Sequence, residues 1–230
     1  GGSSQAVPFF VPGTDRYNEE FDNITGTLRS EGGTKFFDNS SLYNVHGEYI
    51  FTPTWIDKIT VGANARLYTP ESKGTVFSDS LDIEITNFEF GIYIGAEKAL
   101  FNNKVKLQGA YRVDKNENFN AVVSPAISAV FSPAPDHTFR LTFSTAVRNP
   151  TLADQYIYYD VGRAILIGNL NGYDSLVTVD SFLEALDGIP DFDASKLDYF
   201  NVAPIRPERV QTIELGYRGM INKKFYVDAS

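Results

Sequence analysis

The feature that most constrains the fold is an alternation of apolar and polar residues along segments of about ten residues. This period of two is typical of a β-strand, whose successive side chains point to opposite faces of a sheet. One such strand fits any half-buried sheet, so the connections must decide the architecture. The clearest segment, His137–Arg148, has on one face Phe139, Leu141, Phe143, Thr145 and Val147, and on the other Thr138, Arg140, Thr142, Ser144, Ala146 and Arg148.

The connections between alternating segments are short and long in turn. In an up-and-down meander every second link lies at the same end of the sheet, so the long links would share one end. The sequence therefore predicts an all-β fold, an antiparallel meander of about eight strands over 41–230, after a loop-rich segment over 1–40 with at most one hairpin. The short links are 52–57, 101–103, 132–136 and 222–223, and the longer ones 70–82, 114–120 and 149–207.

This rhythm predicts part of a transmembrane β-barrel, with its apolar face toward lipid and its polar face toward a wet lumen. The segment 225–229 is shorter than the roughly nine to eleven residues of a spanning strand, so the sheet would belong to a larger barrel. Aromatic residues near the short links would form a girdle at the membrane interface. They are Phe51, Trp55, Phe101, Phe131, Phe139 and Phe225.

A soluble all-β ligand-binding or adhesin domain is the alternative. It predicts that Phe139, Leu141 and Phe143 face a dry protein core, whereas the barrel hypothesis places them on the outside. Detergent dependence would separate the two.

Composition narrows the function. The formal net charge of −9 argues against nucleic acid as a partner, and the absence of cysteine excludes thiol chemistry. Neither His46 nor His137 has a second metal ligand at a recognisable spacing, so no metal site is expected. No nucleophile and base converge in the sequence, which predicts a protein that is not an enzyme and needs no cofactor. Gly1–Ser4 have no basic region and no apolar core behind them, unlike a signal peptide.

Two features of the strands carry further expectations. Pro125 cannot donate to a β-ladder, which predicts an irregularity in its strand. Charged residues of both signs fall on the polar face, where we expect salt bridges that order the wall and contact a plug. The residues of this expected lumen-facing wall are Arg66, Glu89, Arg112, Arg140, Glu214 and Arg218.

The link 149–207 is the best candidate for a functional loop, because loops of this length are uncommon unless they are functional or disordered. A solvated acidic surface loop is the simpler alternative. Ser181–Glu184 has the form of a capping box, and Gly188 and Pro190 could end a short helix there. As an extracellular loop it would help to capture a ligand, and the candidate residues are Arg148, Asp154, Tyr156, Tyr158, Tyr159 and Arg163.

The segment Thr138–Leu152, with the letters TFRLTFSTAVRNPTL, resembles a barrel strand of TonB-dependent outer-membrane receptors. That family often ends this strand in Ala-Phe-Arg-Xaa-Pro-Thr-Leu, and Val147 stands where Phe is frequent. Ser124–Phe131 resembles the preceding strand of the family, and Pro207–Gly219 resembles the following one. The resemblance covers residues 41–230 and is specific to the receptor class rather than to a ligand.

The resemblance implies a segment of an outer-membrane transporter barrel of about twenty-two strands. Such a transporter imports a bulky nutrient, such as a siderophore, cobalamin or glycan. Its partners would be outer-membrane lipid, a plug domain, TonB and the nutrient ligand. Neither a plug nor a TonB box is visible in this sequence, so we expect an internal barrel fragment that transports nothing by itself.

Overall fold

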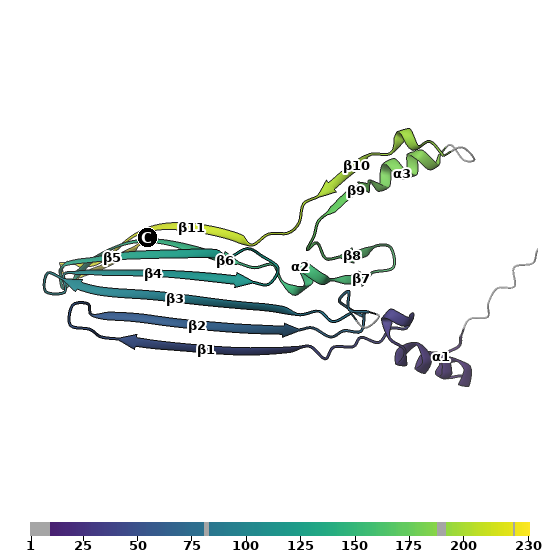
Figure 1. Cartoon of the computed structure of the whole chain (residues 1–230), viewed down its shortest axis with the longest axis horizontal. Coiled ribbons are helices and arrows are strands. Elements are labelled where there is room, and N and C mark those ends of the chain that lie inside the picture. The colour runs from purple at the N-terminus through teal and green to yellow at the C-terminus, as the bar shows by residue number, and fades with distance from the viewer. Residues whose placement is uncertain (1–9, 81–82, 188–191, 223) are drawn as a thin grey trace, which may run out of the picture. The chain divides into compact units, whose positions relative to one another are not determined.

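The fold is an eight-stranded antiparallel sheet, which confirms the predicted meander (Figure 1). The computed structural model describes residues 10–80, 83–187, 192–222 and 224–230, so Gly1–Ser4, Gly188, Pro190 and Lys223 lie outside the described residues. The sheet order is β1 (Ser41–Phe51), β2 (Lys58–Thr69), β3 (Asn87–Leu100), β4 (Val105–Asn116), β5 (Val122–Ala134), β6 (His137–Arg148), β11 (Glu208–Ile221) and β12 (Phe225–Ala229).

The short links are tight enough to keep neighbouring strands in register. Between β3 and β4 the pairing runs without a break from Glu89 opposite Asn116 to Leu100 opposite Val105. The turn that joins them places Asn102 and Asn103 at φ values of 55° and 66°, a left-handed conformation that asparagine tolerates better than most residues.

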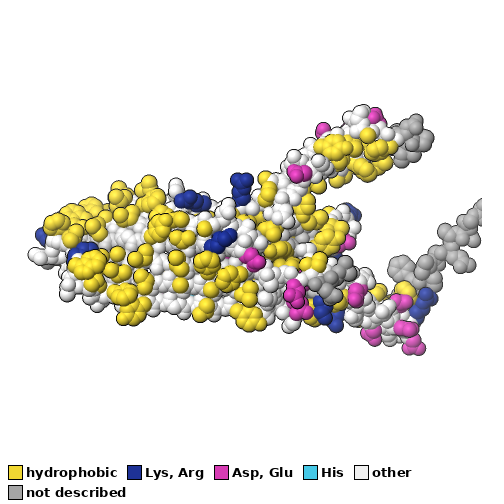
Figure 2. Space-filling model, in the orientation of Figure 1, with side chains coloured by type: hydrophobic (Ala, Val, Ile, Leu, Met, Phe, Trp, Pro, Cys, Tyr) yellow, Lys and Arg dark blue, Asp and Glu magenta, His cyan; other side chains and the backbone are white. Residues whose placement is uncertain are grey.

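The register aligns the apolar faces of adjacent strands, with Leu215 beside Leu141 and Leu141 beside Ala129. Side chains on this face are open rather than packed, since Leu215 is 71% and Leu141 52% exposed. Hydrophobic side chains follow the strands over the face of the sheet seen in Figure 2. The buried hydrophobic residues of the described chain are only Ile85, Phe119 and Ala185. The dry core that a soluble domain predicts around Leu141 is therefore not formed.

Pro125 lies in an unbroken β4 ladder, opposite Tyr111. The ladder between β5 and β6 begins only one residue later, with Ala126 opposite Ser144. The expected irregularity thus takes the form of a missing stretch of pairing with β6, because proline has no N–H to donate. A separate register shift falls between Phe131 and Ala134, next to the turn.

The segment 1–40 differs from its prediction. Among its described residues the structure has helix α1 (Asp15–Gly26) and the short 3₁₀ helix η1 (Arg29–Glu31). Thr14 caps α1 by accepting a hydrogen bond from the backbone N–H of Tyr17, at 3.3 Å. Pro12 and Gly13, which favour a loop, precede the helix, and Gly26 is its last residue, so they bound the helix instead of interrupting it. No helix in the described part of the chain is long and apolar enough to cross a membrane.

The link 149–207 is folded over much of its length. Thr178, rather than Ser181, caps the expected short helix by accepting from the backbone N–H of Ser181 at 3.3 Å. The elements of this link are α2 (Leu152–Tyr156), β7 (Tyr158–Asp160), β8 (Ile165–Ile167), β9 (Tyr173–Val177), α3 (Val179–Leu186), η2 (Ala194–Lys196) and β10 (Tyr199–Val202). Strands β7 and β8 pair with each other, as do β9 and β10.

The chain divides into two compact units whose boundaries differ from the predicted 1–40 and 41–230. The wall unit comprises Leu42–Tyr68, Thr86–Gln155 and Asn169–Ser230, and so holds nearly all of the sheet. The loop unit comprises the described residues up to Ser41, together with Thr69–Ile85 and Tyr156–Gly168. The N-terminal segment and parts of two links, which are distant in sequence, therefore form one folded body.

A buried carboxylate organises the loop unit. Asp79 is 8% exposed and accepts hydrogen bonds from the Ser72 hydroxyl at 2.6 Å and the Gly74 N–H at 2.7 Å. It also accepts from the backbone N–H groups of Ser72 and Lys73. Burial acts to raise the pKa of Asp79, but these hydrogen bonds together hold it below its ordinary value.

Asp79→Asn is expected to loosen residues 72–79 by about 2–3 kcal/mol, since it replaces a charged acceptor of several buried donors. Because the folded pKa is lowered, acid has the same effect: the stabilisation is complete above about pH 4, the unfolded value, and is lost as pH falls through the folded pKa. Amide hydrogen exchange across 72–79 measures both effects. Asp38→Asn is the control, because that exposed carboxylate accepts a backbone bond only from nearby Ser40. Equal exchange in the two variants would contradict the prediction.

Candidate functional site

A polar pocket of about 670 Å³ lies in the wall unit, on the face of the sheet opposite the apolar one. Strands β2, β3 and β4 supply one side of it. Residues 149–155, which follow β6 and which we call the root segment, supply the other. The side chains that matter for its chemistry are Asn64, Arg66, Tyr68, Asn87, Glu89, Arg112, Asp114, Asn116, Asn149 and Gln155.

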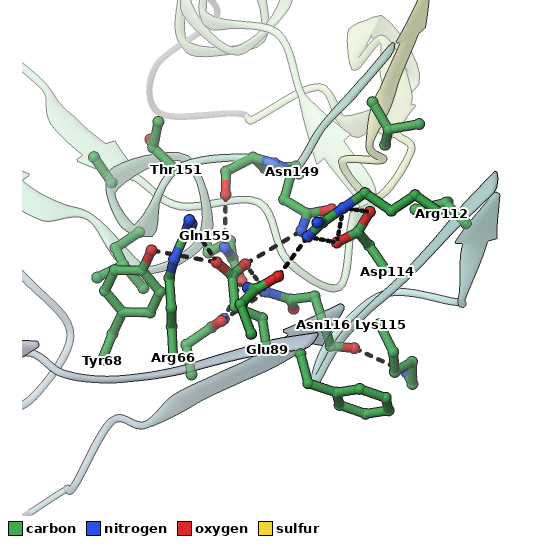
Figure 3. A pocket seen from close by; sticks show the side chains of 18 residues that line it. Arg66, Tyr68, Glu89, Arg112, Asp114, Lys115, Asn116, Asn149, Thr151 and Gln155 are labelled. Carbon is green, nitrogen blue, oxygen red and sulfur yellow. Dashed lines mark hydrogen bonds and ion pairs between the residues drawn. The ribbon is translucent and has the colours of Figure 1, made fainter. Parts of the chain in front are cut away.

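Glu89 is the centre of the hydrogen bonding in this pocket (Figure 3). One carboxylate oxygen, Oε1, accepts from Arg66 Nη1 at 3.0 Å and from the Tyr68 hydroxyl at 3.3 Å. The other, Oε2, accepts from the side-chain amides of Asn116 at 3.5 Å and Asn149 at 3.4 Å. A single carboxylate thus joins three strands of the wall to the root segment.

Arg112 and Asp114 form a second ion pair at the rim of the pocket. The guanidinium donates to Asp114 through Nε and Nη2, at 2.5–2.9 Å, and Nη2 also reaches Asn64 Oδ1 at 2.7 Å. The pair lies against Gly91, where a Cβ atom would come within 2.3 Å of the guanidinium. A side chain at this position would therefore displace the ion pair from where it lies.

Neutral amides form the floor of the pocket. Asn87, Asn116 and Gln155 are 1%, 3% and 4% exposed. Asn116 Nδ2 donates to Asn87 Oδ1 at 2.7 Å, and Asn87 Nδ2 donates to Gln155 Oε1 at 3.1 Å. The pocket therefore offers paired ions and amide groups, a set suited to hydrogen bonding with a polar surface or solute rather than to covalent chemistry.

The structure brings only some of the predicted wall residues together. Arg66, Glu89 and Arg112 line the same pocket. Arg140 and Glu214 form an ion pair between β6 and β11, and the guanidinium of Arg218 lies 5.5 Å from the ring centre of Tyr226. An exposed ion pair such as Arg140–Glu214 contributes about 0–1 kcal/mol, so it adds little to the stability of the wall.

The six predicted ligand residues are divided between the two units. Arg148 and Asp154 belong to the wall unit, whereas the other four belong to the loop unit. The Thr151 hydroxyl and N–H both donate to Asp154, at 2.7 and 2.8 Å, and they lower the pKa of that carboxyl. The loop-unit members are Tyr156 at the end of α2, Tyr158 and Tyr159 in β7, and Arg163 between β7 and β8.

Tyr159 has a defined setting within the loop unit. Its ring stacks on Phe36 with a centroid distance of 6.0 Å, and the Arg29 guanidinium lies 4.6 Å from its ring centre. Arg29 also donates to the backbone oxygen of Asp160. This tyrosine is therefore held in place by cation–π and aromatic contacts.

The amides Asn87, Asn116, Asn149 and Gln155 were not among the residues predicted from the sequence, because a neutral amide has neither the charge nor the ring that marked the candidates. Asn87 and Asn116 lie at the ends of β3 and β4 on the polar face, which was the one signal that could have found them. Asn149 and Gln155 lie in the link 149–207, where no such pattern exists. Across the described residues there is no group of three His, Cys, Asp or Glu side chains able to hold a metal ion.

The fold and the pocket define the class of protein: a sheet with an open apolar face and a hydrogen-bonded polar face is the wall of an outer-membrane type β-barrel. Residues 3–230 match the family model of the TonB dependent receptor-like β-barrel, and the chain belongs to this family. The family consists of outer-membrane receptors and transporters, not of enzymes, and its members work with a plug domain, TonB and a ligand.

A solved structure shares the fold, and a second one is similar. The siderophore receptor PirA from Pseudomonas aeruginosa is 19% identical, with a TM-score of 0.53 over 81% of this chain and 31% of that one. PirA from Acinetobacter baumannii is 13% identical, with a TM-score of 0.49 over 84% of this chain and 27% of that one. The chain thus spans about a third of the receptors it matches. Comparison with curated proteins gave no match.

Proposed function

We propose that this chain is a stretch of the barrel wall of an outer-membrane transporter that imports a bulky nutrient, such as a siderophore, cobalamin or glycan. In the intact protein a plug domain would fill the lumen, and TonB would supply the energy for import. Outer-membrane lipid would cover the apolar face of the sheet. This stretch of wall would hold no cofactor and perform no covalent chemistry.

The observation that carries the proposal is the contrast between the two faces of one sheet. Ile213 and Leu215 are 76% and 71% exposed on the apolar face. Exposing apolar side chains of this size to water is unfavourable, whereas contact with lipid is not. On the polar face, Arg66 pairs with Glu89 and Lys106 with Glu97, at 3.0 and 2.6 Å. A wall with this polarity separates lipid from a polar interior.

The long link supports a role in ligand capture at the end of the wall. Arg148, Asp154, Tyr156, Tyr158, Tyr159 and Arg163 are proposed to contribute to it. The two units place these residues in separate groups, so we assign the capture to the folded link as a whole. The polar pocket next to the root segment is proposed to contact the plug or the passing nutrient.

The proposal is tested by uptake in cells that contain the complete receptor. Three probes represent the candidate nutrients: a ferric siderophore labelled with radioactive iron, cyanocobalamin, and an oligosaccharide. The expected result is receptor-dependent accumulation of one probe, which falls to background when TonB is removed. The siderophore is the first probe to try, because receptors for siderophores share this fold.

Cells without the receptor and cells without TonB are the controls. Accumulation of all three probes without any dependence on the receptor would contradict the proposed transport. Uptake that depends on the receptor but not on TonB would indicate a passive pore and would contradict the energised mechanism.

A further inference from the structure

The root segment, residues 149–155, lies where the chain passes from the wall unit into the loop unit. Gln155 is the last residue of the wall unit before this passage, and Asn169 is the first after the return. The backbone N–H of Asn169 donates to the carbonyl of Asp154 at 2.9 Å, so outgoing and returning chain meet at the root. The position of the root therefore determines where the long link begins.

The side chain of Gln155 makes three hydrogen bonds. Its Oε1 accepts from Asn87 Nδ2 at 3.1 Å and from Asn118 Nδ2 at 2.8 Å, which ties the root to β3 and to the β4–β5 link. Its Nε2 donates to the carbonyl of Pro150 at 2.9 Å, which closes the root on itself. A side chain that is 4% exposed thus has both ends of its amide in use.

The second tie of the root runs through Asn149. Its amide reaches Glu89 Oε2 at 3.4 Å, and Glu89 also accepts from Asn116, which donates to Asn87. The two ends of the root are therefore linked through the wall by one continuous set of hydrogen bonds. Buried and satisfied networks of this kind fix a single arrangement, because each broken bond leaves a donor without a partner.

We propose that Gln155 is a positioning residue that locks the root segment to the wall, so that the root keeps its place whatever the long link beyond it does. The lock separates the conformation of the wall from that of the link. It does not depend on which nutrient the receptor binds.

The test is amide hydrogen exchange of the complete receptor in lipid nanodiscs. Gln155→Leu keeps the volume but removes the amide, which leaves the Asn87 and Asn118 donors without this acceptor. The expected result is exchange about tenfold to a hundredfold faster across 150–156, with strands β3 and β4 unchanged. Gln155→Glu keeps an acceptor for the Asn87 and Asn118 donors but loses the hydrogen bond to Pro150, so it should recover part of the protection and exchange clearly more slowly than Gln155→Leu.

Gln211→Leu is the matched control, since it makes the same chemical change at an exposed position of β11. If Gln155→Leu and Gln211→Leu give the same exchange at the root, Gln155 does not lock it. Equal loss in the Leu and Glu variants, or loss shared by root and sheet, would also overturn the proposal. If Gln155→Leu does not fold, Asn118→Ala removes one donor and is expected to give a smaller rise at the root alone.

Discussion

Leu141→Arg is expected to destabilise the complete receptor by about 2–4 kcal/mol in a lipid bilayer, the cost of an arginine on the lipid face near the membrane midplane. Leu141 lies near the middle of β6, between Leu215 and Ala129, and its side chain is 52% exposed on the apolar face. Urea titration in lipid vesicles, followed by the change in electrophoretic mobility of folded barrels, measures the loss.

Thr142→Arg is the matched control for this prediction. Thr142 is the next residue and lies on the opposite face, where Glu214 is its cross-strand neighbour. An arginine there meets a carboxylate and a polar surface, so the free energy of unfolding should change by less than about 1 kcal/mol. Equal destabilisation by the two variants would show that the apolar face does not meet lipid.

Deletion of residues 160–200 from the complete receptor is expected to weaken nutrient binding about thirtyfold or more, the size of effect that follows from losing an energetic hot spot. The wall should still fold, because the root segment is fixed to the sheet by its own hydrogen bonds. Binding of the probe that the uptake experiment identifies, together with the heat-modified mobility of the barrel, measures the two results separately.

A narrower deletion shows which part of the link is needed for nutrient binding. The backbone carbonyl of Asn169 accepts a hydrogen bond from the N–H of Ile205 at 3.0 Å, and its side-chain amide donates to the carbonyl of Ala203 at 2.8 Å. The two ends of the part that contains α3 are therefore bonded to each other. Joining Asn169 to Ile205 through two glycines removes this part and keeps Tyr156–Gly168. If the narrow deletion binds normally and the wide one does not, residues 160–169, which include Arg163, are needed to capture the ligand. Normal binding by both would contradict the capture hypothesis.

The strands could be predicted because their signal is local. Face alternation and link length are both read within a few residues, and the predicted pattern over Phe88–Glu97 matches the core of β3. Helix α1 was missed because Pro12, Gly13 and Gly26 indicate a loop when read one at a time. Only the spacing of Tyr17, Phe21 and Ile24, at helical intervals, distinguishes the helix.

The pocket could be predicted only in part, because its hydrogen bonds join distant segments. Glu89 and Arg66 are 23 residues apart, and charge alone made both of them candidates. Gln155 lies 68 residues from Asn87 and 37 from Asn118, and no local pattern connects these three amides. The loop unit was not predicted for the same reason, since it combines the N-terminal segment with parts of two links that are separate in the sequence.

Pro125 has a consequence for how the wall assembles. The backbone pairing of β5 with β6 extends from their turn only as far as Ala126, because Pro125 has no N–H to donate the next ladder hydrogen bond. Beyond that point the ends of the two strands are not paired with each other. The end of β5 connects to the β4–β5 link, and the end of β6 connects to the root segment. The side-chain hydrogen bond from Asn118 to Gln155, at 2.8 Å, joins the β4–β5 link to the root segment where this backbone pairing has ended. Because of this proline, side-chain hydrogen bonds replace backbone pairing at the place where the chain leaves the sheet.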